Sequence, residues 1–275
     1  MRLIDFDAQF TRYLTEWAEE NRDSYARADD MEKDLPSVYD AFLDTPAAWL
    51  NDQAPGEYFG TYTDADELCN ILSEYVAAGI GVPDMLLSRI ADLGQASEKP
   101  LYACVQDTYR PREERMLAIS LLRDLGSFAP LKLFVRWQVT HEEDAELCDN
   151  AIESLEEMGD AAVPDMLLAL EDADDAAQEA LLSVLSRHPG DERIYRGLIR
   201  LFGLHPERRA ILAAYLGRLG DDRALPILME AAASEETGYL DFIELRSAIE
   251  GLGGEAPMHE FGEDPDYNAL FGTEE

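Results

Sequence analysis

Residues 207–228 read Glu-Arg-Arg-Ala-Ile-Leu-Ala-Ala-Tyr-Leu-Gly-Arg-Leu-Gly-Asp-Asp-Arg-Ala-Leu-Pro-Ile-Leu, and this stretch decides the fold. An apolar helical segment ends at Leu219-Gly220, and Pro226 follows six residues after that glycine. Glycine adopts the left-handed backbone conformation that ends a helix, whereas proline suits the first turn of a helix. The stretch therefore predicts one helix, a tight corner and a second helix.

A glycine of this kind recurs along the chain at steps of 30 to 33 residues. The corners are marked by Gly94, Gly126, Gly159, Gly190, Gly220 and Gly253. Five of these glycines precede a proline, at Pro100, Pro130, Pro164, Pro226 and Pro257. Between corners, apolar residues recur with helical spacing, for example at Ala118, Leu121, Leu122 and Leu125. A single helix pair cannot bury its apolar face, so we predict stacked pairs in an all-α solenoid.

Residues 207–228 resemble the short HEAT-like repeat, and Ala151 to Leu168 resemble a second copy, with Gly159 and Pro164 at the matching places. The resemblance covers roughly residues 64–253 and implies an α-solenoid of HEAT-like helix pairs. It implies no single function, because such solenoids serve unrelated roles. HEAT-like bilin lyases and DNA glycosylases share the fold, but the glycosylase role needs a basic groove that this sequence lacks.

The two ends of the chain differ from the repeats. Residues 1–63 hold 11 of the 25 aromatic residues, and Phe6, Phe10, Tyr13 and Trp17 follow a helical stripe. The end of a solenoid needs a cover, so we predict a helical N-terminal cap over 1–63, with a separate binding domain as the alternative. Residues 254–275 predict an acidic, partly disordered tail with a short helix around 268–271. The predicted domains are 1–63, 64–253 and 254–275.

The chain is strongly acidic, with 22 basic and 58 acidic residues and a net charge of −36. Such a field repels phosphate backbones and anionic membrane surfaces, so neither nucleic acid nor a membrane is an expected partner. The sequence contains no apolar run of about 18 residues, so we expect no membrane span. Two explanations of the acidity stay open: attraction of a basic partner, or a solubility trait shared by the whole proteome.

The charge is unevenly distributed. Residues 137–186 contain 15 acidic and no basic residues, whereas 187–223 contain eight basic and five acidic residues. The candidate interaction residues are Arg193, Arg196, Arg200, Arg208 and Arg209, together with Glu142, Glu143, Glu146, Glu153, Glu156 and Glu157. The spacing of the first three arginines predicts an exposed stripe opposite an apolar helix face. These arginines either pair with the acidic helices of adjoining repeats or bind an anion or acidic motif.

No pattern points to catalysis or to a cofactor. The two His-Glu dyads, His141-Glu142 and His259-Glu260, lie at different distances from their repeat glycines, so we expect no shared metal site. The three cysteines stand apart among apolar neighbours, at Cys69, Cys104 and Cys148. They predict buried, reduced thiols and a cytoplasmic location. Phosphate-binding, dinucleotide-binding and serine-hydrolase motifs are lacking. We therefore predict no enzymatic activity, no metal and no cofactor.

The sequence as a whole predicts a non-catalytic scaffold for protein–protein interaction, built on the solenoid surface. Its partner would be another protein, and a basic one would suit the acidic stretch. The alternative is a HEAT-like protein that binds a small molecule or acts as an enzyme, with a pocket between the N-terminal cap and the repeats.

Overall fold

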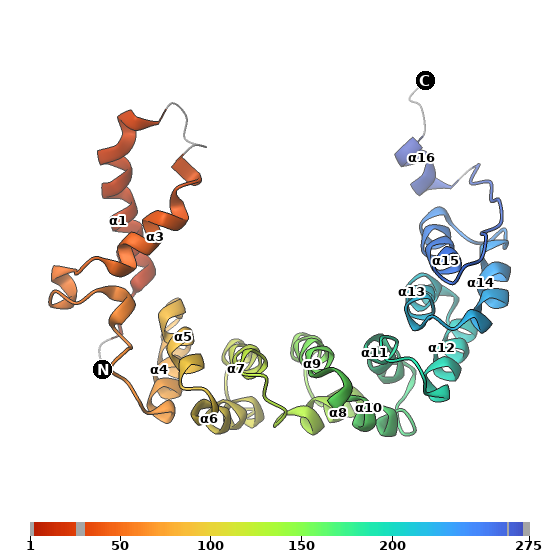
Figure 1. Ribbon diagram of the computed structural model, residues 1–275, viewed down its shortest axis with the longest axis horizontal. Coiled ribbons are helices and arrows are strands. Elements are labelled where there is room, and N and C mark those ends of the chain that lie inside the picture. Colours follow the sequence, from red (N-terminus) through yellow and green to blue (C-terminus); the bar gives the residue numbers. More distant parts are fainter. Residues whose placement is uncertain (1–2, 26–30, 263, 272–275) are drawn as a thin grey trace. The chain divides into compact units, whose positions relative to one another are not determined.

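The computed structural model describes residues 3–25, 31–262 and 264–271, and it is helical along most of the chain (Figure 1). Helices make up 71% of it, and the described residues form no strand, only an isolated antiparallel bridge between Ala47 and Gln53. The predicted all-α solenoid fold is thus confirmed. The chain divides into two compact units, Met1–Ala129 and Pro130–Glu275. The division at residues 63 and 253 does not coincide with these units and stays a prediction.

Helices α1 (Phe6–Asn21) and α3 (Leu35–Asp44) of the first unit carry six of the aromatic residues of the predicted cap, namely Phe6, Phe10, Tyr13, Trp17, Tyr39 and Phe42. The unit also contains α4 (Ala65–Ala78), α5 (Asp84–Asp92), α6 (Gln95–Gln106) and α7 (Arg112–Asp124). Phe6 is the buried residue of α1, while Phe10, Tyr13 and Trp17 are half-buried. The Tyr75 hydroxyl on α4 donates a 2.9 Å hydrogen bond to the carbonyl oxygen of Ile4, which ties the start of the chain to the first repeat helix.

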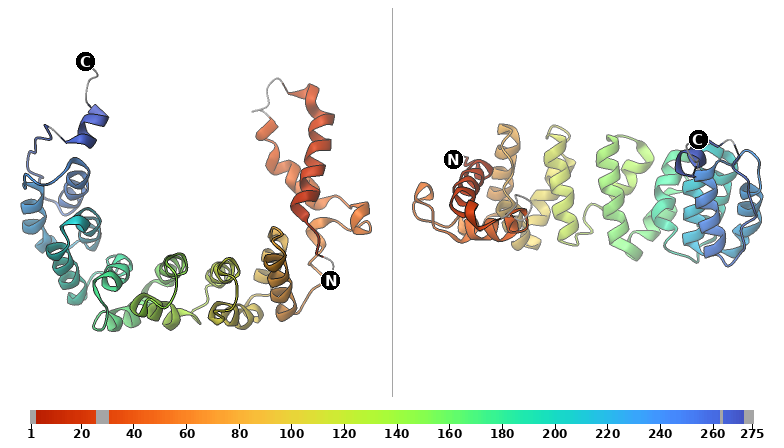
Figure 2. Two further views of the ribbon diagram at one scale, coloured as in Figure 1. Left: turned by 180° about the vertical axis from the view of Figure 1, so that it is seen from behind. Right: turned by 90° about the horizontal axis from the view of Figure 1, so that it is seen from above.

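The second unit consists of helix pairs in two layers. Its helices are α8 (Leu131–Thr140), α9 (Ala145–Met158), α10 (Val163–Ala169), α11 (Asp175–Leu185), α12 (Glu192–Leu204), α13 (Arg209–Leu219), α14 (Leu225–Ala232), α15 (Tyr239–Gly251) and α16 (Pro265–Phe271). Within this unit α9, α11, α13 and α15 follow one another in one layer, and α8, α10, α12 and α14 in the other (Figures 1 and 2). This alternation is what stacked helix pairs predict.

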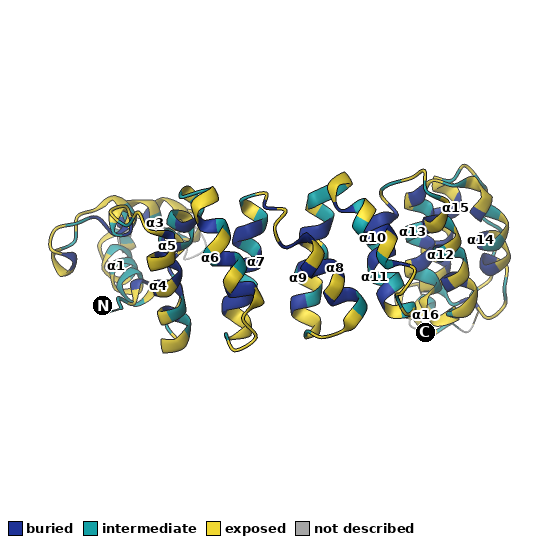
Figure 3. Ribbon diagram, turned by 90° about the horizontal axis from the view of Figure 1, so that it is seen from below, coloured by how far each residue is buried: buried dark blue, intermediate teal, exposed yellow. Residues whose placement is uncertain are grey.

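The apolar stripes read from the sequence form the core between the layers. On α12, for example, Ile194, Leu198, Leu201 and Phe202 are buried, as the helical spacing requires. Each labelled repeat helix carries buried residues on one face and exposed residues on another (Figure 3). Within the described ranges, none of the helices combines the length and the apolar composition that a bilayer crossing requires.

All six corner glycines have positive φ angles, and Gly220 ends α13 in the predicted left-handed conformation, whereas Gly94 and Gly159 adopt a different one. Gly94 and Gly159 combine φ of 59° and 57° with ψ of −129° and −134°, a region that only glycine occupies without strain. Pro164 and Pro226 lie in the first turns of α10 and α14, as expected.

Two of the five proline assignments are wrong. Pro100 lies inside α6, because that helix begins directly after Gly94, five residues before the proline. A proline at this interior position has no N–H to donate to the preceding turn. Pro257 begins no helix, because the described residues between Gly254 and α16 form none.

The C-terminal segment is more ordered than the sequence suggests, at least as far as Phe271. Helix α16 begins at Pro265, earlier than predicted, and packs against α15. The Asp264 carboxylate accepts hydrogen bonds from the backbone N–H groups of Tyr239 (3.0 Å) and Tyr267 (2.9 Å). An aromatic cluster joins the two helices to the intervening segment and comprises Tyr239, Phe242, His259, Phe261, Tyr267 and Phe271. Residues 272–275 of the predicted tail lie outside the described residues.

Candidate functional site

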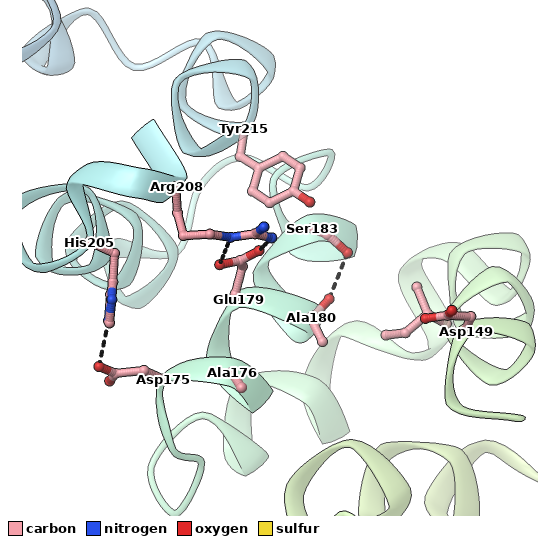
Figure 4. A pocket seen from close by; sticks show the side chains of 10 residues that line it. Asp149, Asp175, Ala176, Glu179, Ala180, Ser183, His205, Arg208 and Tyr215 are labelled. Atoms are coloured by element: carbon pink, nitrogen blue, oxygen red, sulfur yellow. Dashed lines mark hydrogen bonds and ion pairs between the residues drawn. The ribbon is translucent and has the colours of Figure 1, made fainter. Parts of the chain in front are cut away.

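A groove of about 610 Å³ crosses three successive helices of one layer in the second unit (Figure 4). Its lining residues come from α9, α11, α13 and the 3₁₀ turn that precedes α13, and they are Asp149, Ile152, Asp175, Ala176, Glu179, Ala180, Ser183, His205, Arg208 and Tyr215. Three of the lining residues on α11 are small, namely Ala176, Ala180 and Ser183, whereas α9 contributes Ile152 and α13 contributes Tyr215. The small side chains of α11 leave room between these two larger ones.

The groove combines an apolar floor with a charged rim. Ile152, Ala180 and the ring of Tyr215 are partly exposed and supply apolar surface. Burial raises the pKa of the Tyr215 hydroxyl above its usual value of 10.0, so this group stays neutral at physiological pH. Such a surface suits an amphipathic segment of another molecule.

The basic groups of the rim are held by carboxylates from the preceding repeat. Arg208 binds Glu179 through two hydrogen bonds, one of them 3.1 Å from Nε to Oε2. His205 Nε2 lies 2.7 Å from Asp175 Oδ2, and Arg200 donates a 2.7 Å hydrogen bond to Oδ1 of the same carboxylate. The hydrogen bond with Asp175 raises the pKa of His205, and the bonds from His205 and Arg200 lower the pKa of Asp175.

The predicted arginine stripe is exposed, but its guanidinium groups are engaged within the chain. Arg193 binds Asp191 at 2.8 Å, Arg196 binds Glu192 at 3.2 Å and Arg200 binds Asp175 at 2.7 Å. The interaction of Arg193 lowers the pKa of Asp191 to about 2. Arg209 instead lies over the ring of Phe202, 5.7 Å from its centroid. These contacts favour internal pairing over an anion site, and a role of the stripe in recognition stays a prediction.

Successive repeats are joined by a series of ion pairs whose members lie about one period apart. Their members are Arg187 with Glu156, Arg208 with Glu179, and Arg223 with Glu192, the last at 2.9 Å. The sequence separations are 31, 29 and 31 residues. We call these the inter-repeat ion pairs. In the sequence, these pairs could have been recognised as an arginine about 30 residues after a glutamate. Two of them join arginines of the basic segment 187–223 to glutamates of the acidic segment 137–186.

The six glutamates singled out from the sequence lie on or just before α9. Glu146, Glu153 and Glu157 are exposed, whereas Glu143 is half-buried. Glu142 pairs with Arg136 at 2.9 Å, and Glu156 pairs with Arg187. The carboxylate that α9 contributes to the groove is Asp149, which sequence reasoning did not single out. Helical spacing from Ile152 could have placed it beside the apolar floor.

Three of the four histidines bind an aspartate of a different helix pair. They are His141 with Asp174 at 3.1 Å, His188 with Asp160 at 2.9 Å, and His205 with Asp175 at 2.7 Å. The fourth, His259, lies 3.2 Å from the carbonyl oxygen of Ala232 and belongs to the aromatic cluster at α15. The two His-Glu dyads are thus held in separate environments. In the part of the chain that the structure describes, no three His, Cys, Asp or Glu side chains converge as a potential metal site.

The buried thiols belong to a polar cluster in the first unit. Glu114 is almost fully buried and binds Arg110, and it accepts a 2.5 Å hydrogen bond from the hydroxyl of Ser73. Burial raises the pKa of both Cys69 and Cys104 to about 12, so both are protonated and unreactive. Cys148 is only half-buried, contrary to the prediction, because it follows the loop that starts α9.

A second, smaller cleft of about 370 Å³ lies in the first unit. It is lined by Gln9, Arg12, Tyr13, Glu16, Phe42, Thr45, Pro46, Ala47 and Trp49. All of these residues belong to the predicted cap, so this cleft lies within the cap and not between the cap and the repeats.

Comparison with known families identifies the repeat that the sequence predicted. The PBS lyase HEAT-like repeat matches residues 208–234, which include α13 and α14 together with the Gly220 corner between them. No curated protein matches the chain. Residues 208–234 thus match a HEAT-like repeat, and the helix pairs and glycine corners of the other described repeats are consistent with a HEAT-like repeat protein.

Proposed function

We propose that this protein is a non-catalytic scaffold that binds another protein along the groove formed by α9, α11 and α13. HEAT-like repeats often mediate protein interaction, and the family is generally non-catalytic. The observation that supports the proposal best is the groove itself, which is open, extends across three consecutive repeats and combines apolar with charged residues. A protein segment can follow such a surface from one repeat to the next.

A positively charged segment fits this groove better than an acidic one. Three carboxylates line it, at Asp149, Asp175 and Glu179, against one arginine and one histidine. The adjoining face of α9 adds the exposed Glu146 and Glu153. Complementary charge speeds association and disfavours wrong partners. The arginines nearby are already bound to carboxylates, which makes them weaker candidates for holding an acidic partner.

Site-specific photo-crosslinking tests the proposal. A photoreactive amino acid replaces Ala180 in the groove, and in a matched control it replaces Leu168, which is 64% exposed on α10 in the other layer. Both proteins are irradiated in native lysate, and the crosslinked species are identified by mass spectrometry. We expect a defined protein adduct at position 180 that is missing at position 168.

Two outcomes would contradict the proposal. Equal crosslinking from both positions would show that the groove has no special affinity. The photoreactive residue can also be placed at position 176 or 152. If none of the positions 180, 176 and 152 gives a protein adduct, and a small molecule co-purifies with the chain, a small-molecule role is favoured.

The cleft in the predicted cap supports a second candidate function, the binding of an aromatic or apolar small molecule. Tyr13, Phe42 and Trp49 line this cleft, and Trp49 is 43% exposed. A ligand there would change the tryptophan fluorescence of the wild type through Trp49. It should leave the tryptophan fluorescence of a Trp49→Phe variant unchanged. The enzymatic alternative and the cytoplasmic location remain predictions from the sequence.

A further inference from the structure

The repeats that contain α9 and α11 can be superimposed through their capping residues. Asp144 caps α9 by accepting a hydrogen bond from Leu147 N (3.1 Å), and Asp174 caps α11 by accepting one from Ala177 N (2.9 Å). The two caps lie 30 residues apart. The same offset relates Asp149 on α9 to Glu179 on α11, and both line the groove.

The equivalent carboxylates differ in their partners. Glu179 holds Arg208 of the next repeat in an inter-repeat ion pair. Arg208 is the N-cap residue of α13, so the residue that corresponds to it one repeat earlier is Asp174, the N-cap residue of α11. The Asp174 carboxylate caps its own helix and lies 3.1 Å from His141 Nε2. This position therefore offers Asp149 no guanidinium.

The carboxylate of Asp149 consequently has no cation of its own. Among the described residues, no hydrogen bond or ion pair to this carboxylate is found, and it lies apart from the bonded groups of the groove (Figure 4). Lysine and arginine are lacking throughout 137–186, so α9, α10 and α11 supply no cation to it. The side chain is exposed, and Ile152 on the same helix places apolar surface beside it.

We propose that Asp149 is the anchoring residue of the groove and binds one arginine side chain of the partner protein. This inference rests on the proposed function and specifies the chemistry of that partner. The arginine would supply to α9 the guanidinium that Arg208 supplies to α11. Arginine fits better than lysine, because its planar guanidinium forms two parallel hydrogen bonds with a carboxylate. An apolar residue one helical turn away on the partner would pack on Ile152 and Ala180.

Binding of synthetic peptides to the full chain tests this assignment. The probe is a fluorescent helical peptide with leucines on one face, one arginine beside them and otherwise neutral residues. Its twin carries citrulline, which has nearly the same shape as arginine but no charge. We expect the wild type to prefer arginine over citrulline by about three- to tenfold. Asp149→Asn should remove the preference, and the lysine peptide should give an intermediate affinity.

A charge-matched variant separates a specific contact from the general acidity of the chain. Glu157→Gln removes one negative charge from the same helix, outside the groove, and should keep the preference. Equal loss in both variants would overturn the inference, as would a full preference in Asp149→Asn. The inference would also be overturned if none of the peptides bound at about 1 mM. At that concentration only complexes with a Kd above about 1 mM escape detection. None of these three results would affect the crosslinks at position 180, which test the scaffold function separately.

Discussion

His205 is the residue through which pH acts on the groove, because its imidazole binds Asp175 on one side and lies 3.2 Å from Glu207 on the other. The hydrogen bond with Asp175 raises its pKa above the usual 6.5. Protonated His205 is therefore stabilised in the folded chain. Its contribution is fully present below pH 6.5 and is lost as pH rises through the raised pKa.

A His205→Asn variant should show this pH dependence. Urea denaturation measures the free energy of unfolding of the wild type and of the variant. We expect the wild type to be the more stable of the two, by a larger difference at about pH 5.5 than at about pH 8.5. The Asp175→Asn background should reduce the pH dependence of the difference, because Glu207 alone then raises the pKa of His205. A difference that grows with pH would contradict the assigned contact.

The corner glycines provide a prediction that concerns the backbone alone. At Gly159 an added Cβ would meet no atom within 4 Å, so Gly159→Ala should destabilise only through its positive φ, by about 1–2 kcal/mol. Gly203 lies within α12 and also has open space around its Cα, but without a positive φ. Gly203→Ala should therefore stabilise by about 0.5–1 kcal/mol. Urea denaturation of both variants checks the contrast, and equal effects would refute it.

At the scale of helices, the inter-repeat ion pairs connect neighbouring repeats, whereas the sequence alone gives only the order of the helices. Arg208→Ala removes a two-bond contact with Glu179, whose side chain is only 18% exposed. Because Arg208 itself is 48% exposed, solvent weakens the pair, and we expect a loss of about 0.5–1 kcal/mol. Arg196→Ala should cost less, since Arg196 is 77% exposed and pairs within its own helix. Thermal unfolding of both variants measures the difference, and the reverse order would contradict it.

The helices and their corners could be predicted because glycine and apolar spacing report on local geometry. Gly94 and Gly220 mark corners through backbone conformations that depend on few neighbours. The groove could not be predicted in the same way, because it depends on residues from three repeats meeting in space. For Arg208 the sequence allows either an internal carboxylate or an external anion as the partner, and only the structure identifies Glu179. Asp149 was overlooked because carboxylates are abundant in the sequence.

At the scale of the whole chain, net charge opposes compactness. A chain with a charge of −36 repels itself, and salt screens exposed charges beyond about 8 Å at physiological ionic strength. We expect the urea midpoint to rise between about 20 mM and about 500 mM NaCl, because repulsion outweighs the exposed ion pairs. An equally concentrated neutral osmolyte serves as a control for effects other than screening. A falling midpoint would show that the ion pairs dominate.

Salt should have the opposite effect on partner binding. If the α9 face attracts a basic protein, the association rate should fall over the same range of NaCl. Stopped-flow measurements with the partner identified at position 180 would show it. An unchanged rate would indicate that Glu146 and Glu153 do not steer the encounter.

The aromatic cluster at α15 also bears on how the chain behaves at high concentration. A stack of similar repeats offers at its end a surface that another stack can extend, so uncovered ends invite open-ended polymers. Phe261 and Tyr267 pack against Tyr239 there, and Asp264 fastens the covering segment to the first N–H of the helix. We therefore expect this segment to prevent end-to-end stacking. A chain cut after Gly253 should form filaments or aggregates at concentrations where the 275-residue chain stays dispersed.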